Sequence, residues 1–277
     1  MKKSDLHFGI EIEYLNAPSN KITRKLKHFP ITAGEERYDR WIYKKEVEIT
    51  KHKNRRVLLG GEVASRILTF EDSSLEEIKQ VLDILKKHNA DVDHRTALQY
   101  HISLSPLERI KERLETLMKL IAIYEHVIYK VGYNGSTPRK NILAFANPSR
   151  EKIIGILDNK IDTYNELLMQ LQNALISKCY GINLGVYLAI KFLNTIEFRM
   201  CNGSLDYKVL EVEINLFCNL VLSCIKELDK EFLDYKFKNI RDNDYSKIYL
   251  SDAEELTDIL GYTEKEKEAF IYQYMKK

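Results

Sequence analysis

The chain has 277 residues, of which 43 are basic and 41 acidic, and 44% are hydrophobic. This composition is typical of a soluble globular protein and excludes a disordered chain, which combines low hydrophobicity with high net charge. The net charge of +2 gives no support for a broad nucleic-acid interface. No apolar run reaches about 18 residues and none follows the basic N-terminus, so we expect neither a membrane span nor a signal peptide.

Hydrophobic periodicity predicts the elements of the N-terminal half. Residues 7–15 alternate apolar and polar side chains, which is the period of a strand. Further strands are predicted over residues 41–50, 56–59 and 99–104, and residues 62–70 are predicted to form a strand or a bent extended segment. A basic turn at 51–55 would join the first two of these, and Gly60–Gly61 is expected to interrupt the strand pattern. Ser73 or Ser74, with Glu76 or Glu77, is a candidate helix N-cap.

The C-terminal half is richer in helix. Helices are predicted over residues 107–131, 158–177 and 210–228, and strands over 180–184 and 194–200. In the charged tail, Ser251 with Glu254 and Thr263 with Glu266 form two candidate capping boxes, which predict two short closing helices. Strand pairs in hairpins and helices of unequal length favour an α+β fold over a doubly wound sheet.

The four cysteines have no CxxC spacing. They are Cys179, Cys201, Cys218 and Cys224, and the last two lie in an apolar helical run. We therefore expect reduced, buried thiols in a cytoplasmic protein.

Two strands carry charged side chains at alternate positions. Glu11 and Glu13 share one strand face, about 7 Å apart, and either bind a common cation or form a solvated outer face. Glu197 and Arg199 repeat this spacing, either as a surface ion pair or as a metal ligand beside a phosphate clamp. His101, on another strand, is structural or a ligand. Glu62 follows two glycines, which either make a turn or permit a close backbone approach. The sequence contains no P-loop, GxGxxG or GxSxG motif.

Five segments in this order resemble the amidoligases, relatives of glutamine synthetase and glutamate–cysteine ligase. They are FGIEIEY at 8–14, EVASRIL at 62–68, QYHIS at 99–103, GINL at 181–184, and TIEFR with NGSLD between 195 and 206. The resemblance implies an amidoligase-like catalytic domain over residues 1–228, with a charged helical extension over 229–277 packed on it. The implied fold is α+β: a curved, mainly antiparallel half-barrel sheet of the glutamine synthetase catalytic type, with the site on its concave face and helices on its convex face.

The resemblance also implies an activity, an ATP-dependent carbon–nitrogen ligase. ATP would phosphorylate a carboxylate, and an amine would attack the acyl phosphate to give an amide or peptide bond. The implied cofactors are ATP and Mg²⁺ or Mn²⁺. The substrates would be carboxylates and amines of small molecules or peptides. Neither nucleic acid nor a membrane is expected as a partner, and enzymes of the same gene cluster are candidate partners.

The motifs assign roles to individual residues. Glu13 and Glu62 would bind one metal, and Glu11, His101 and Glu197 a second one nearer the phosphates, because Mg²⁺ prefers oxygen ligands. Arg199 would clamp a phosphate during catalysis, together with metal-bound Glu62 and Glu197. Arg139, Lys178 and Asn183 would complete the nucleotide site.

The sequence departs from the family in three places. Residues 45–50 lack an Asp-x-Ser element, so Glu46 or Glu48 is a candidate replacement; Arg66 stands where the family has proline; and only His101 remains of Gly-x-His-x-His. These departures indicate an unusual substrate. Two alternatives stay open: a phosphotransferase on the same kind of sheet, and a catalytically decayed ligase that serves as a binding or regulatory protein. The joint retention of the charged residues argues against decay.

Overall fold

The computed structural model describes residues 2–26, 41–53, 56–136, 146–176, 179–184, 187–188, 191–192, 194–240, 244–245 and 247–276. Its strands are β1 (His7–Leu15), β2 (Ile42–Lys53), β3 (Arg56–Ala64), β4 (Leu68–Thr69), β5 (Ala97–Ser103), β6 (Ile182–Asn183), β7 (Tyr187–Leu188), β8 (Lys191–Phe192) and β9 (Thr195–Asn202). Its α-helices are α1 (Ser19–Leu26), α2 (Asp72–Lys87), α3 (Lys111–Tyr133), α5 (Arg150–Leu157), α6 (Tyr164–Leu175), α7 (Tyr207–Ser223), α8 (Lys230–Lys238), α9 (Leu250–Leu260) and α10 (Glu264–Met275). Two 3₁₀ turns, η1 (Lys3–Asp5) and η2 (Ser105–Leu107), complete the described elements.

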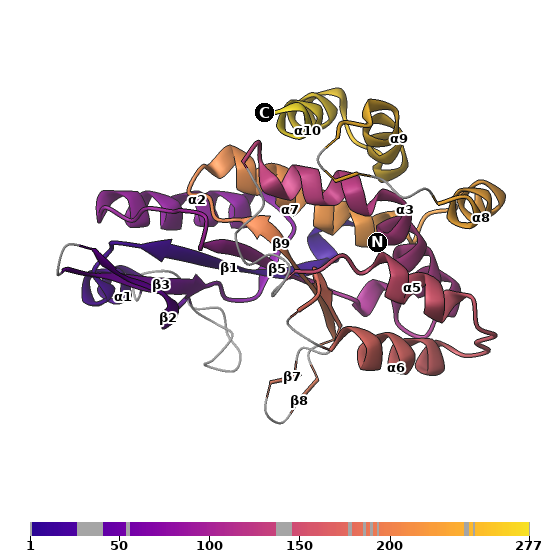
Figure 1. The fold of residues 1–277 in the computed structure, drawn as a ribbon, viewed down its shortest axis with the longest axis horizontal. Coiled ribbons are helices and arrows are strands. Elements are labelled where there is room, and N and C mark those ends of the chain that lie inside the picture. The colour runs from indigo at the N-terminus through magenta and orange to yellow at the C-terminus, as the bar shows by residue number, and fades with distance from the viewer. Residues whose placement is uncertain are drawn as a thin grey trace.

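An open sheet forms the centre of the molecule (Figure 1). Seven strands make it up, in the order β2-β3-β1-β5-β9-β6, with β4 also pairing with β1. Every pair in this sheet is antiparallel, and β2 and β6 form its two edges. The helices α2, α3 and α7 cover one face (Figure 1). The α+β prediction is therefore confirmed, whereas the half-barrel shape of the glutamine synthetase type stays a prediction.

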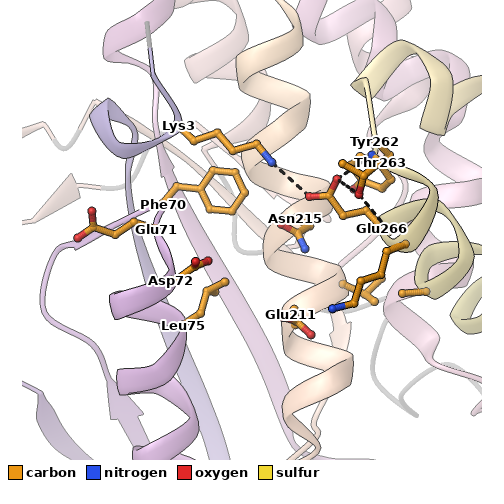
Figure 2. Close-up of a pocket in the computed structure, with 13 residues that line it drawn as sticks. Lys3, Phe70, Glu71, Asp72, Leu75, Glu211, Asn215, Tyr262, Thr263 and Glu266 are labelled. Carbon is orange, nitrogen blue, oxygen red and sulfur yellow. Dashed lines mark hydrogen bonds and ion pairs between the residues drawn. The ribbon is translucent and has the colours of Figure 1, made fainter.

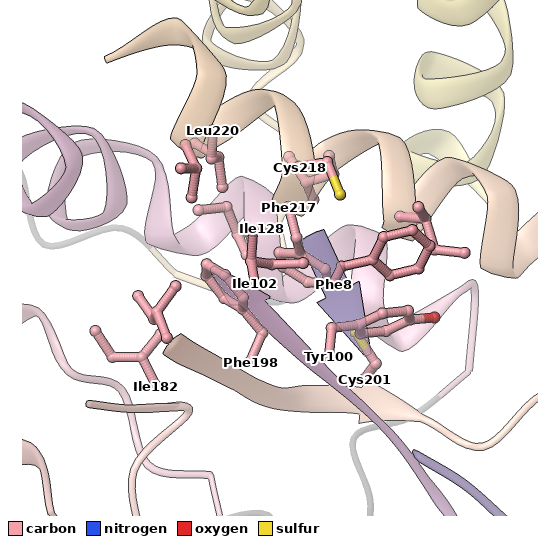
Figure 3. Close-up of a cluster of buried hydrophobic side chains, with 14 of the residues drawn as sticks. Phe8, Tyr100, Ile102, Ile128, Ile182, Phe198, Cys201, Phe217, Cys218 and Leu220 are labelled. Carbon is pink, nitrogen blue, oxygen red and sulfur yellow. The ribbon is translucent and has the colours of Figure 1, made fainter. Parts of the chain in front are cut away.

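The apolar side chains of alternate strand positions pack beneath α7. Phe198 of β9 stacks on Phe217 of α7 with ring centroids 4.2 Å apart, and Tyr100 of β5 lies 5.1 Å from the same ring (Figure 3). All three are almost completely buried. Since successive strand residues point to opposite faces, this packing leaves Glu197, Arg199 and their neighbours on the other face of the sheet.

The N-terminal half corrects two predictions. Gly60 and Gly61 do not interrupt the strand, since β3 runs through both. A Cβ at Gly61 would lie 2.8 Å from the Tyr14 hydroxyl and from the Tyr43 ring, so packing rather than a turn requires glycine there. The N-cap of α2 is Glu71, and Ser74 lies inside the helix, where its hydroxyl accepts the Thr69 N–H at 3.3 Å.

The C-terminal half also differs from prediction. The helix predicted over 158–177 is α6, which begins at Tyr164 with Thr163 as its N-cap, and the prediction did not include the preceding helix α5. The capping box of Thr263 and Glu266 is confirmed. The one at Ser251 is wrong, because α9 begins at Leu250 with Tyr249 as its N-cap. The tail also forms a third helix, α8, which was not predicted from the sequence.

The cysteines and the helix lengths answer two further expectations. None of the four cysteines forms a disulfide; Cys201, Cys218 and Cys224 are buried, but Cys179 is exposed in the loop before β6, so that part of the prediction is wrong. In the described part of the chain, no helix has the length and apolar character needed to cross a membrane.

Candidate active site

Polar side chains from four neighbouring strands meet on the sheet face away from α7. They are Glu62 of β3, Glu11 and Glu13 of β1, Gln99 and His101 of β5, and Glu197 and Arg199 of β9, with Asn183 of the edge strand β6 beside them. Direct pairing sets their positions: Glu13 lies opposite Glu62, Glu11 opposite Gln99, and Glu197 opposite both His101 and Asn183. The register thus brings together residues that are up to 188 positions apart, from Glu11 to Arg199.

Arg199 is held by two partners on this face. Its Nη1 donates to a Glu197 carboxylate oxygen and, at 2.6 Å, to Oε1 of Gln99. Asn183 donates to the other Glu197 oxygen at 2.9 Å. Glu197 and Arg199 are 4% and 9% exposed, which excludes the surface-pair interpretation. Such charge-assisted contacts fix the direction in which the guanidinium points.

Gln99 links this group to Glu13, a role that was not predicted from the sequence. Its Nε2 donates to Oε1 of Glu13 at 3.2 Å, while its Oε1 accepts from Arg199. Glu13 also accepts the Ala97 N–H at 2.8 Å and is 9% exposed. The signal that could have revealed Gln99 is its position two residues before His101, on the same strand face.

His101 lies between two carboxylates. Its Nε2 is 3.6 Å from Oε1 of Glu11, and Glu197 is its direct neighbour on β9. Burial by itself would lower the pKa of His101, but Glu11 and Glu197 outweigh burial and raise it. Both ring nitrogens are buried and make no hydrogen bond within the described residues. Once it has lost its proton, a ring between two carboxylates can serve as a metal ligand with them.

The donor types fit a hard divalent cation. Glu62, like Glu13, is buried, and carboxylates with one imidazole are ligands that Mg²⁺ and Mn²⁺ accept. Among the described residues, however, no group of three or more His, Cys, Asp and Glu side chains is already assembled as a metal site. The carboxylates therefore lie on one face without a preformed cage.

Four candidate residues cannot be placed in the site. Arg139 and Lys178 lie outside the described residues. For Glu46 and Glu48 only the backbone is described, and Glu46 pairs with Gly60 across β2 and β3.

The segment after Glu62 is fixed by its own contacts. The Ser65 hydroxyl accepts the Ile10 N–H at 2.9 Å. Arg66 makes an ion pair of 2.6 Å with buried Glu77, which also accepts the Trp41 indole N–H at 2.7 Å. Arg66 therefore ties the strand that carries Glu62 to α2.

A separate cavity of about 300 Å³ lies on the helical side of the molecule (Figure 2). It opens between the start of α2, α7 and α10, and the ion pair of Lys3 with Glu266, at 3.2 Å, spans one side of it. The Lys3 ammonium also lies 5.1 Å from the centre of the Phe70 ring. None of the residues predicted for the site lines this cavity.

The fold and the polar face define an α+β protein with a buried, charged site on an open antiparallel sheet. The family model described as "putative amidoligase enzyme" matches residues 4–221, so the chain belongs to the amidoligase family, a family of ligases. The match covers every described residue of the polar face and ends before α8. A comparison with curated proteins finds no match.

Proposed function

We propose that the protein is an ATP- and Mg²⁺-dependent carboxylate–amine ligase. The observation that carries this proposal is the buried guanidinium of Arg199, fixed by Glu197 and Gln99 on the face that also holds Glu11, Glu13, Glu62 and His101. A buried arginine among carboxylates is suited to a site that binds a phosphate next to cations.

The reaction balances with two substrates and ATP. An oxygen of the substrate carboxylate attacks the γ-phosphorus of ATP, and ADP leaves. The amine then attacks the acyl carbon, phosphate leaves, and the nitrogen loses one proton. Mg²⁺ or Mn²⁺, held by Glu13 and Glu62 and by Glu11, His101 and Glu197, would neutralise the triphosphate charge.

The chain's own residues supply alignment and charge. Arg199 would hold phosphate oxygens as negative charge moves onto the leaving group. Gln99 and Asn183 keep Arg199 and Glu197 in place, so that little reorganisation is needed during the reaction. Arg139 and Lys178 are proposed to join Arg199 at the phosphates.

A screen of amino acids and peptides for ADP release, followed by mass spectrometry, tests the proposal. We expect ADP formation that depends on Mg²⁺ and on both substrates, with a product lighter by one water than their sum. A phosphorylated product without amide would favour a phosphotransferase. Absence of ADP release across the screen, with folded protein and Mg²⁺ present, would favour the decayed ligase.

Thermal melts provide an independent test of nucleotide binding. ATP should raise the melting temperature with Mg²⁺ or Mn²⁺ present and not with EDTA, because a ligand stabilises the state that binds it. Glu62→Gln should weaken this metal-dependent shift, whereas Glu76→Gln, on the exposed face of α2, should leave it unchanged. Equal stabilisation by ATP with EDTA would contradict the proposed metal dependence.

A further inference from the structure

A cavity of about 410 Å³ lies next to the first residue of β9, and none of the residues of the candidate active site lines it. Its polar lining consists of Glu108, Arg109, Tyr164, Asn165, Gln172 and Asn194. These side chains come from the turn before α3, from α6, and from the residue that precedes β9. The lining combines one cation, one anion, one phenol and three amides.

The strands β5 and β9 lead from the candidate site to this cavity. Glu197 pairs with His101, and the next pair on the same face is Thr195 with Ser103. Asn194 follows, and its carbonyl accepts the Leu104 N–H at 2.9 Å. At about 3.3 Å per strand residue, the backbone of Asn194 is about 10 Å from that of Glu197.

One side of α6 faces the cavity. Tyr164, Asn165 and Gln172 line it, while Leu167 and Leu171 are buried in the core. Tyr164 is 9% exposed, and its hydroxyl has no hydrogen-bond partner in the part of the chain that the structure describes. A buried hydroxyl without a partner in the protein is unusual, because most such groups are satisfied by protein or by ordered water.

Two neighbouring residues bring opposite charges to the cavity. Arg109 has φ = +64°, a left-handed backbone conformation that is uncommon for arginine. Its side chain is exposed and makes no ion pair within the described residues. Glu108 accepts a hydrogen bond from the Asn194 amide. A ligand with adjacent negative and positive groups would complement this pair.

We propose that the cavity binds the zwitterionic group of a free α-amino acid. Its carboxylate would meet the guanidinium of Arg109, which can hold both oxygens, and its ammonium would meet the carboxylate of Glu108. The Tyr164 hydroxyl and the amides of Asn165 and Gln172 would take the remaining hydrogen bonds. The role of this amino acid as a co-substrate rests on the proposed function, since its side chain would extend along β9 toward Glu197.

Binding can be measured without ATP. We suggest saturation-transfer NMR of the full chain with each of the twenty common amino acids, then titration of the strongest binder beside its N-acetyl and carboxamide derivatives. We expect at least one amino acid to bind, and each derivative, which lacks one charge, to bind at least tenfold more weakly. No binding by any amino acid, or equal binding by the derivatives, would overturn the proposal.

Arg109→Asn separates binding from folding, because asparagine tolerates a left-handed backbone while removing the charge. This variant should bind the amino acid at least tenfold more weakly at an unchanged melting temperature. Lys160→Asn is the matched control, because it removes one charge from a side chain that is 88% exposed just before α6. Unaltered affinity in Arg109→Asn would remove the cavity from consideration.

The two proposals can fail separately. Amino acid binding that depends on Arg109, without ligation of any substrate, would support the cavity and contradict the ligase. Ligation with the same KM for the amino acid in wild type and Arg109→Asn would support the ligase and contradict the cavity.

Discussion

At the scale of single residues, Arg199 decides how the site can be tested, because its guanidinium already has two protein partners. Glu197 and Gln99 accept from the same nitrogen, Nη1. The side chain is therefore oriented before any substrate binds. Lysine keeps the charge but cannot reproduce the planar fork of donors.

Arg199→Lys should lower kcat more than it weakens ATP binding. The loss of one charge-stabilising contact in the transition state costs about 10²–10³ in rate, whereas binding of ground-state ATP changes little. The measurement is product formation against ATP concentration, with thermal melts to establish folding. Wild-type turnover in a folded mutant would exclude Arg199 from the reaction.

Glu213, on the core side of the sheet, carries a different prediction. Burial raises its pKa to about 8, although the hydrogen bond from the Tyr100 hydroxyl opposes the shift. The folded state therefore retains a proton that the unfolded state has lost, and the free energy of unfolding falls as the pH rises from about 4.5 to about 8.

Glu213→Gln removes this titration. The free energy of unfolding of the variant minus that of wild type should rise by roughly 2–3 kcal/mol from pH 4 to pH 7. The reason is that wild type loses stability over this range through Glu213, whereas glutamine does not titrate. Urea unfolding at pH 4, 5.5 and 7 measures the difference. A constant offset between the two proteins across this range would contradict the prediction.

At the scale of elements, Gly61 lies inside the continuous strand β3, at a position where two tyrosines leave no room for a side chain. Gly61→Ala should lower the free energy of unfolding by about 1–3 kcal/mol, because its Cβ would overlap Tyr14 and Tyr43. Gly9→Ala is the matched control on β1, since its Cβ would meet only ordinary contacts at 3.6 Å or more. Denaturant unfolding of both variants measures the effect, and equal stabilities would show that Gly61 is not constrained by packing.

The same elements show what the sequence could predict. The alternation over residues 7–15 predicts β1 with its observed bounds and places Glu11 and Glu13 on one face, because strand period is a local property. The spacing of Glu197 and Arg199 predicts their shared face in the same way. The N-cap of α2 was assigned wrongly, because the Ser74 hydroxyl accepts the Thr69 N–H of β4 instead of capping the helix.

The register of the strands explains why the other contacts of the site could not be predicted from the sequence. The link from Arg199 through Gln99 to Glu13 exists only because β1, β5 and β9 pair in one particular alignment. No local pattern specifies which residues lie opposite each other on strands that are about 90 residues apart. The resemblance to amidoligases supplied the metal-ligand candidates, whereas Gln99 and the cavity at Arg109 required the structure.

At the scale of the whole molecule, the helices after Asp229 complete the fold. Phe270 and Tyr274 of α10 and Leu256 of α9 are buried in the same apolar core as the sheet. The family match ends at residue 221, so these helices lie outside the matched part of the chain. They lie over α3 and α7 (Figure 1).

A polar seam joins these helices to α3 and α5. The Tyr245 hydroxyl donates to buried Glu125 at 2.7 Å, and Glu125 also accepts the N–H groups of Ser149 and Arg150 at the start of α5. His126 connects the same region to α9, with its Nε2 2.9 Å from Oδ2 of Asp252. Its Nδ1 lies 3.4 Å from Nη2 of Arg150. A neutral ring suits both contacts, since Nδ1 can accept from Arg150 while Nε2–H donates to Asp252.

The free energy of unfolding should therefore fall in mild acid, through protonation of His126 in this seam. Burial lowers the pKa of His126 to about 4, outweighing the opposing effect of Asp252, while its ordinary value is 6.5. Between these values the unfolded state binds a proton that the folded state does not, so the free energy of unfolding falls as the pH falls. The expected loss from this one residue is about 2 kcal/mol between pH 7 and pH 5.

His126→Gln tests this directly, because glutamine cannot titrate. The variant should be less stable than wild type at pH 7 through lost contacts, and the gap should shrink by about 2 kcal/mol at pH 5. His94→Gln, at an exposed position, controls for the general effect of removing a histidine and should parallel wild type. The measurement is denaturant unfolding of the three proteins from pH 7 to pH 5. If the curve of His126→Gln also ran parallel to wild type, protonation of this seam would not limit the attachment of the C-terminal helices.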